Sequence, residues 1–212
     1  MRRWETVYFS GNSKGEKNMR KNWAALALTG MLCLTTFAGT QTVSAETADS
    51  AKQVDIVFTH DTHSHLNTFT TVVDDAEKEV GGFARINTLI QEQKAKNPDT
   101  LVIDGGDFSM GTLIQTVFET QAAEIRMLGY MGCDVTTLGN HEFDYRSKGL
   151  ANMLNSATES GDNLPALVVC NVDWDSMEQT GLSDGQQQIQ SAFETYGVKD
   201  YVVLQKGNVK IA

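Results

Sequence analysis

The chain has 212 residues and is acidic, with 17 Lys and Arg against 27 Asp and Glu and a formal net charge of −10. Such a surface repels nucleic acids and anionic membranes, so neither is an expected partner. The part that follows residue 45 is long enough for one domain with a sizeable hydrophobic core.

Residues 1–45 have the pattern of a secretory signal peptide. A basic pair precedes an uncharged, mostly apolar run from Ala24 to Phe37, and small residues allow cleavage after Ala45. The alternative is an uncleaved anchor, but the run is short for a span of about 20 residues. Met19 is the expected start, which makes 1–18 an overlong beginning. After cleavage we expect no membrane span and a secreted product, outside the cell or in the periplasm or cell envelope.

A polar leader at 46–53 is followed by strands and helices in alternation. Short β-branched and aromatic runs predict buried strands at 54–59, 100–104, 135–138 and 166–170. Apolar residues at helical spacing predict helices between Gly82 and Asn97, over about 121–128 and over 146–156.

Two polar stretches of the chain are expected to be irregular, 60–81 and 173–197, the first with room for one helical turn. Near the end, residues 201–205 and 209–211 flank a Lys-Gly-Asn turn, which predicts a β-hairpin. The hairpin is the last element that the sequence predicts.

Some apolar and cysteine residues are expected inside. Phe83, Ile86 and Leu89 share the first predicted helix and are assigned to the core. Cys133 and Cys170 lie beside apolar runs, so two buried thiols are expected, with a disulfide as the alternative.

Strands that alternate with helices predict an α/β fold with a largely parallel sheet and helices on its faces. Ligands of such sheets bind beyond the carboxyl ends of the strands. Polar residues stand at those ends here: Asp61 and His63 follow the first strand, Asp107 the second, and Asn140 and His141 the third. We therefore expect these side chains to converge on one site.

The donor types point to divalent cations. A carboxylate and an imidazole from one loop, Asp61 and His63, suit zinc, manganese or another first-row metal. Asp107 follows two glycines, and its two oxygens could bridge a pair of cations. Asn140 offers a neutral oxygen. Each short motif alone is usually a surface turn, but their joint occurrence at successive strand ends favours a metal site.

Residues 54–212 resemble the N-terminal catalytic domain of secreted 5′-nucleotidases, within the calcineurin-like metallophosphoesterases. The segments that carry the resemblance are Asp61-Thr62-His63-Ser64-His65, Gly82-Phe83-Ala84-Arg85, Gly106-Asp107 with Gly111-Thr112, and Gly139-Asn140-His141-Glu142-Phe143-Asp144. The last of these segments is the most specific. The resemblance implies one incomplete half of an α/β/β/α sandwich, so that 54–212 would be a truncated metallophosphoesterase domain.

The resemblance also implies roles for individual residues. Asp61 and His63 would bind the first of two divalent metal ions, Asp107 would bridge, and Asn140 would bind the second. His141 would act catalytically on the phosphoryl group, paired with Asp144. Three other residues in or next to these segments are expected to have supporting roles. Arg85, in a helix after Gly81-Gly82, should form a structural pairing, His60 should have a structural role or support a metal ligand, and His65 should shape the loop or the rim of the site.

The resemblance is not complete. The family has three further histidines and a base-recognising C-terminal domain, whereas no histidine follows His141 here. We therefore expect an N-terminal fragment of a metal-dependent phosphoester hydrolase, itself inactive or weak. Its partner would be a nucleotide or another small phosphate ester, with cyclic nucleotides and UDP-sugars as further candidates, and the chain would be a monomer. The alternative is a non-catalytic, secreted metal-binding module that retains half of the site.

Overall fold

A computed structural model describes residues 53–212 of the chain. The expected signal peptide at 1–45, and the leader at 46–53 apart from Gln53, lie outside the described residues. Within the described part of the chain, no helix is long and apolar enough to cross a membrane.

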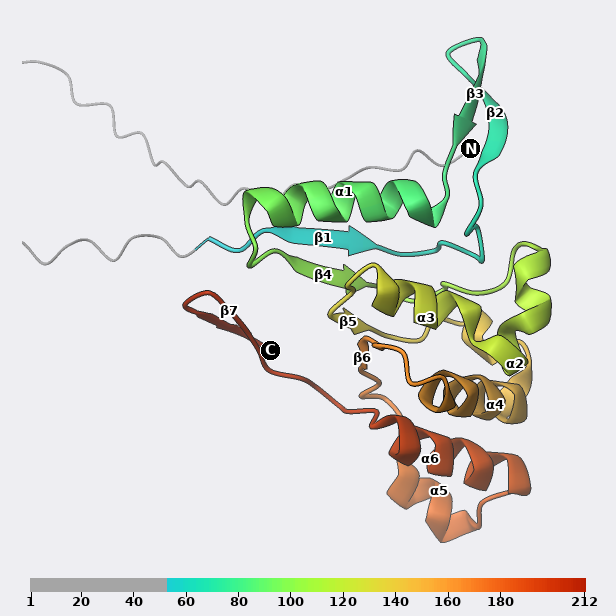
Figure 1. Ribbon diagram of the computed structural model, residues 1–212. Coiled ribbons are helices and arrows are strands. Elements are labelled where there is room, and N and C mark those ends of the chain that lie inside the picture. Colours follow the sequence, from blue (N-terminus) through green and yellow to red (C-terminus); the bar gives the residue numbers. More distant parts are fainter. Residues whose placement is uncertain (1–52) are drawn as a thin grey trace, which may run out of the picture. The chain divides into compact units, whose positions relative to one another are not determined.

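A four-stranded parallel sheet forms the centre of the described part (Figure 1). Its strands, in spatial order, are β1 (Ile56–Thr59), β4 (Leu101–Asp104), β5 (Val135–Thr136) and β6 (Ala166–Leu167). All four predicted strands are present, which confirms the parallel α/β prediction. The last two are shorter than expected. Just after β6, Val168 forms an isolated parallel bridge with Lys199.

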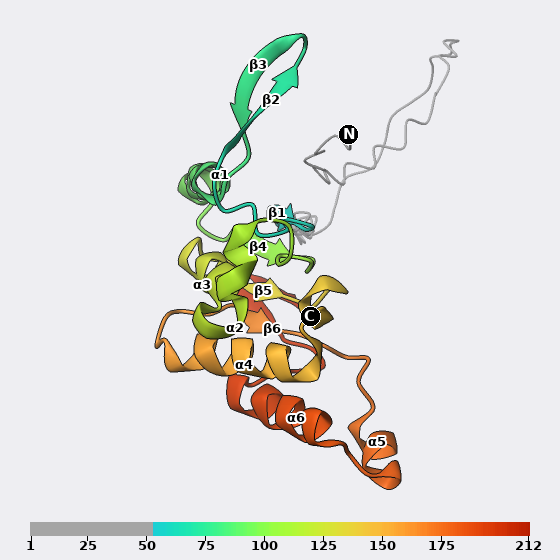
Figure 2. The same ribbon diagram turned by 90° about the vertical axis from the view of Figure 1, so that its right-hand side faces the viewer.

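The connections between these strands carry the helices that flank the sheet. These are α1 (Phe83–Lys96), the 3-10 turn η1 (Leu113–Val117), α2 (Phe118–Gln121), α3 (Ala123–Tyr130) and α4 (Arg146–Glu159). Because the strand order runs in one direction and crossovers are right-handed, successive helices are expected on one side of the sheet. Figure 2 shows α1, α2 and α3 on the same side.

Apolar side chains of these helices and of β4 and β6 form the core. Its fully buried members include Phe83, Ile90, Val102, Ile125, Leu128, Leu150, Leu154 and Leu167. Leu89 is 58% exposed, so its assignment to the core was wrong. Phe83 and Ile90, seven residues apart, fix the buried stripe of α1, and Leu89 falls outside it.

The alternation of β1 shows which face of the sheet the helices leave open. Ile56 and Phe58 are 51% and 58% exposed, whereas Val57 between them packs against the core. Successive side chains of a strand point to opposite faces. The face that carries Ile56 and Phe58 is therefore largely uncovered at this edge by the described residues.

The loop predicted over 60–81 contains a hairpin instead. Strands β2 (Phe69–Val73) and β3 (Ala76–Val80) pair in antiparallel fashion. The turn residues Asp74 and Asp75 both have positive φ angles, 54° and 62°, as a tight hairpin turn requires. The acidic residues made the stretch look irregular, although Phe69-Thr70-Thr71-Val72-Val73 is a sequence of good strand formers.

The prediction of an irregular 173–197 was also wrong, because the segment forms α5 (Trp174–Thr180) and α6 (Asp184–Tyr196). Local signals were present. Asp173 accepts a hydrogen bond from the Ser176 amide at 3.0 Å, and Ser183 and Gln186 form a capping box. Helix α6 packs on α4 and buries Ile189, Ala192 and Phe193.

The last predicted element is confirmed, since β7 (Leu204–Lys206) and β8 (Val209–Ile211) form a hairpin. Both described cysteines are free thiols. Cys133 is buried, and burial raises its pKa to about 12. Cys170 is exposed, so the expectation of a second buried thiol was wrong.

Candidate metal centre

Two loops at the carboxyl edge of the sheet bring three candidate ligands together. Asp61 and His63 follow β1, and Asp107 follows β4. One ligand atom from each of the three lies within 4.8 Å of the others. The carboxyl ends of neighbouring parallel strands meet at one edge, which is why residues far apart in sequence converge there.

Backbone hydrogen bonds extend the pairing of β1 and β4 beyond the strand ends. The Asp61 amide donates to Gly106 O at 3.0 Å, and the His63 amide donates to Asp107 O at 3.0 Å. The next amide in register, that of Ser64, donates to Phe108 O at 2.8 Å. The two ligand loops are therefore fixed to each other by their own main chains.

All three candidate ligands have left-handed backbone conformations. The φ angles are 52° at Asp61, 46° at His63 and 51° at Asp107. Non-glycine residues adopt this region at a cost of about 1–2 kcal/mol each. Such strain persists only where surrounding contacts hold it, and it gathers at functional sites.

The orientation of the His63 ring is set by a backbone carbonyl. Its Nδ1 lies 3.2 Å from Ser109 O, so Nδ1 carries the proton and donates. In the neutral ring, the other nitrogen, Nε2, then carries no proton. This tautomer is the one in which a histidine can bind a metal through Nε2.

Asn140 joins the three ligands through Asp107. The His141 amide donates to Asp107 Oδ1 at 2.9 Å and holds that carboxylate against the turn after β5. In the structure the Asn140 amide oxygen faces only acceptors. With the amide turned over, its nitrogen would donate to Asp107 Oδ2 at 3.2 Å. Two carboxylates, one imidazole and an amide beside Asp107 make up the donor set, and these donor types fit a divalent metal.

His141 lies beside these ligands and pairs with Asp144. Its Nδ1 is 2.8 Å from Asp144 Oδ2, and this hydrogen bond raises the pKa of His141. The His141 ring meets the His63 ring edge to face, with centroids 5.1 Å apart. All six sequence-predicted site residues thus lie at one edge of the sheet.

Close backbone approach at this edge requires glycine at two positions. Gly106 has a φ of 85°, and a Cβ there would lie 2.9 Å from the Leu138 carbonyl carbon. A Cβ at Gly139 would lie 2.6 Å from the Asp107 amide nitrogen. Both distances are too short for a side chain, so the loops of β4 and β5 can approach this closely only with glycine.

Sequence reasoning missed three buried carboxylates beneath the ligand loops. Asp104 accepts from the hydroxyls of Thr59 and Thr136 and from the Gly106 amide, and burial raises its pKa. Glu124 accepts from Ser64 Oγ at 2.6 Å, and burial raises its pKa too. The third is Glu142, which is fully buried. Acidic residues beside an acidic motif look solvated in a sequence, and only packing shows that they are inside.

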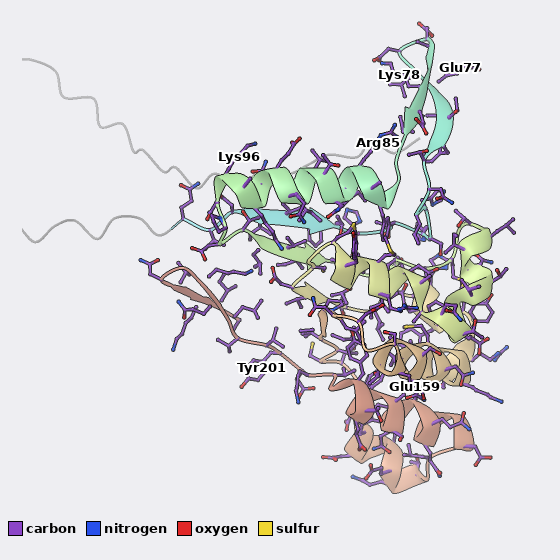
Figure 3. All side chains as sticks on the ribbon, viewed as in Figure 1. Glu77, Lys78, Arg85, Lys96, Glu159 and Tyr201 are labelled. Atoms are coloured by element: carbon purple, nitrogen blue, oxygen red, sulfur yellow. The ribbon has the colours of Figure 1, made fainter. Side chains whose placement is uncertain are left out.

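The other residues of the sequence motifs have local partners. Arg85 forms an ion pair with Glu79 at 3.1 Å and donates to Gly81 O, in agreement with the expected structural pairing. Figure 3 shows Arg85 at the base of the β2–β3 hairpin. His60 Nδ1 lies 3.3 Å from Asp61 Oδ2. His65 Nδ1 lies 3.2 Å from Thr62 O within its own loop.

Comparison with known proteins identifies the class. Residues 54–204 match the family described as calcineurin-like phosphoesterase, and the chain belongs to that family. Relatives include a probable 5′-nucleotidase of Treponema pallidum (strain Nichols), 34% identical over 107 residues that make up 49% of this chain and 18% of the relative. The 5′-nucleotidase of Mus musculus is 36% identical over 110 residues, 50% of this chain and 19% of the relative.

A solved structure has the same fold. The 5′-nucleotidase precursor from Thermus thermophilus superposes with a TM-score of 0.57 and 25% identity, over 73% of this chain and 26% of that chain. The chain thus spans about a fifth of the length of the first curated relatives and a quarter of this structure.

Proposed function

We propose that this chain is the N-terminal part of a secreted, dinuclear metal-dependent hydrolase that acts on nucleotides, a 5′-nucleotidase-like enzyme. The observation that carries the proposal is the meeting of Asp61, His63 and Asp107 within 4.8 Å at the carboxyl edge of the sheet. Family membership and the 5′-nucleotidase names of the relatives favour nucleotide phosphate esters over other esters.

The chain's own residues divide between two cation positions. Asp61 and His63 would hold one cation, Asn140 would hold the other, and Asp107 would serve both. Zinc and manganese suit this mixture of oxygen and nitrogen donors. When bound, the cations polarise the phosphoryl oxygens and lower the pKa of water, which is the chemistry that phosphoester hydrolysis needs.

His141 donates to the phosphoryl group, and Asp144 orients the His141 ring. Asp144 accepts a hydrogen bond from His141 Nδ1, and because this hydrogen bond raises the pKa of His141 it favours the charged imidazolium. The ring can then donate from Nε2 to a phosphoryl oxygen on which negative charge accumulates. Because Asp107 Oδ1 accepts from the His141 amide, the donor and the bridging carboxylate are held in one arrangement.

Cation binding and turnover test the proposal on the 212-residue chain. We expect calorimetry with Mn²⁺ or Zn²⁺ to show one tighter site, where three side chains contribute, and one weaker site that has only Asp107 and Asn140. Hydrolysis of AMP or p-nitrophenyl phosphate by the chain itself should be weak. A chain that binds neither cation would contradict the proposed centre.

The fragment prediction has its own test. DNA that follows codon 212 should encode a Gly-His-x-His segment, and the product of that longer reading frame should hydrolyse AMP in the presence of Mn²⁺. Cyclic nucleotides and UDP-sugars would be assayed beside AMP to define the preferred ester. A longer product without phosphoesterase activity would rule out the enzymatic proposal.

A second candidate function follows from the uneven ligand supply. Three residues are assigned to the first cation and two to the second, and the given sequence has no histidine after His141. This asymmetry favours a non-catalytic metal-binding module as the alternative. It predicts that one cation binds per chain, and that neither the chain nor any longer product hydrolyses phosphate esters.

A further inference from the structure

Glu142 is buried at the centre of the hydrogen bonds that join two of the site loops. It lies in the 3-10 turn η2 (His141–Phe143), and its exposed fraction is 0%. Its Oε2 accepts from the amides of Asp107 at 3.0 Å and Gly139 at 2.7 Å. Its Oε1 accepts from Ser109 twice, from the amide at 3.0 Å and from Oγ at 2.7 Å. Both carboxylate oxygens are therefore fully used.

The donors belong to two different segments that carry candidate ligands. Asp107 and Ser109 lie in the loop after β4, and Gly139 lies in the turn after β5, next to Asn140. One oxygen of Glu142 thus binds the amide of Asp107 and an amide of the other segment at the same time. These donors are backbone N–H groups and one hydroxyl, and they stabilise the buried charge of Glu142.

These hydrogen bonds also stabilise a strained residue. Asp107 has a φ of 51°, and its amide would have to find another acceptor if the Glu142 carboxylate were absent. Leaving a buried amide without an acceptor is unfavourable. Asp107 would then be free to leave the left-handed conformation that directs its carboxylate toward Asn140. Ser109 is linked as well, because its carbonyl accepts from His63 Nδ1 at 3.2 Å.

We propose that Glu142 is a positioning residue that fixes the bridging carboxylate of Asp107 relative to Asn140 and His63, and through them sets the affinity of the centre for cations. It touches neither a cation nor the phosphate ester in this role. The inference rests on the cation site proposed above, and it adds a residue that positions the metal ligands through hydrogen bonds to their backbone.

Amide hydrogen exchange in the metal-free 212-residue chain tests the positioning directly. Glu142→Gln keeps the shape of the side chain but replaces one acceptor oxygen with an NH₂ group, which cannot accept from an amide. We expect the amides of Asp107 and Gly139, or that of Ser109, to exchange at least about 10-fold faster than in the wild type. Equal exchange at all three amides would overturn the proposal, whatever the cation binding.

Mn²⁺ affinity, measured by calorimetry, tests the consequence. Loss of an outer-shell partner typically weakens metal binding by about 10- to 100-fold, and we expect this range for Glu142→Gln. The matched control is Asp134→Asn, which removes a carboxylate that also accepts from a backbone amide but lies at the other end of the sheet. The control should lower the melting temperature and leave Mn²⁺ affinity within about twofold of wild type.

The outcomes separate the two proposals. If the wild-type chain binds Mn²⁺ and Glu142→Gln binds it equally well, only the role of Glu142 is wrong. If the wild type does not bind Mn²⁺, the cation centre itself is wrong and the affinity claim falls with it. Should Glu142→Gln fail to fold, Ser109→Ala decides, since it removes one donor to Glu142 and leaves three. Weaker Mn²⁺ binding at an unchanged melting temperature would support the proposal, and unchanged binding would overturn it.

Discussion

The two ends of the central sheet are held together by different interactions. At the carboxyl end, buried carboxylates accept from backbone amides, and Asp61, His63 and Asp107 are held in left-handed conformations. At the amino end, Lys206 Nζ forms an ion pair with Asp134 at 2.9 Å, and Asp134 accepts from the Val102 amide at 2.9 Å. Asn97 of the same end donates from its side-chain amide to Asp55 at 2.8 Å.

The difference shows where the fold gains stability and where it is strained. The ion pair at the amino end joins the β7–β8 hairpin to the sheet without unusual backbone angles. The carboxyl end combines like charges with left-handed residues, which a protein selected for stability alone would avoid. Substitutions at the carboxyl end should therefore change cation binding most, and those at the amino end should change stability most.

The largest expected effect is that of Asp107→Asn. The amide keeps an acceptor for the His141 amide but loses the charge that two cations would share. We expect Mn²⁺ affinity to fall by more than about 100-fold, beyond the range for outer-shell partners, with little change in melting temperature. Calorimetry and thermal melts of the same samples measure both. Retained affinity would show that the cation lies elsewhere.

Gly139→Ala should combine both kinds of effect. The added Cβ would lie 2.6 Å from the Asp107 amide nitrogen, so the two loops must move apart. Overpacking of this kind costs about 1–3 kcal/mol in the free energy of unfolding, which urea titration measures, and it should also weaken Mn²⁺ binding.

Gly185→Ala is the matched control for this substitution. Gly185 lies in the first turn of α6, and a Cβ there would lie 3.6 Å from Ser147 Cβ, an ordinary contact. Alanine favours the helix over glycine, so stability should be unchanged or higher by up to about 1 kcal/mol. If the two alanine variants had the same free energy of unfolding and the same Mn²⁺ affinity, the close approach of the loops at Gly139 would not be important for either.

At the amino end, Lys206→Met should lower stability without touching the site. It removes the partner of Asp134 while keeping much of the apolar stem, and both side chains are less than a quarter exposed. We expect a loss of about 1–3 kcal/mol, because Asp134 would keep its charge in a partly buried place. Urea titration gives the loss, and calorimetry should give unchanged Mn²⁺ affinity. A changed affinity would contradict the separation of the two ends.

The smallest expected effect is on the pH dependence of stability, and it comes from Glu124 at the carboxyl end of the sheet. Burial raises the pKa of Glu124 above its ordinary 4.5, and its Oε2 has no hydrogen-bond partner among the described residues. The folded chain therefore holds this proton more tightly than the unfolded chain. The resulting stabilisation is complete below pH 4.5 and is lost as the pH rises through the folded pKa.

Glu124→Gln isolates this group, because glutamine cannot ionise and can still accept from Ser64 Oγ. The melting temperature of the variant minus that of the wild type should be near zero at pH 4 and increasingly positive toward pH 8. A difference that stays constant from pH 4 to pH 8 would show that Glu124 has the same pKa in the folded and the unfolded chain.

The sequence alone was sufficient to predict the main strands and helices of the fold. β-Branched runs predicted the four parallel strands, helical spacing predicted α1 and α4, and a Lys-Gly-Asn turn predicted the last hairpin. These patterns are local, so they can be read from neighbouring residues. The convergence of Asp61, Asp107 and Asn140 also followed, since parallel strands end at a common edge.

Features that depend on burial, or on contacts between residues far apart in the sequence, could be identified only from the tertiary structure. Helix α6 was missed because its polar surface outweighs three buried apolar residues, which acquire meaning only against α4. Glu142 reads as one more acidic residue in the motif, and nothing local shows that the Asp107 and Gly139 amides lack other acceptors. Hydrogen-bond partners 35 residues apart are set by chain packing, so the sequence determined which groups could bind cations and the fold decided what holds them in place.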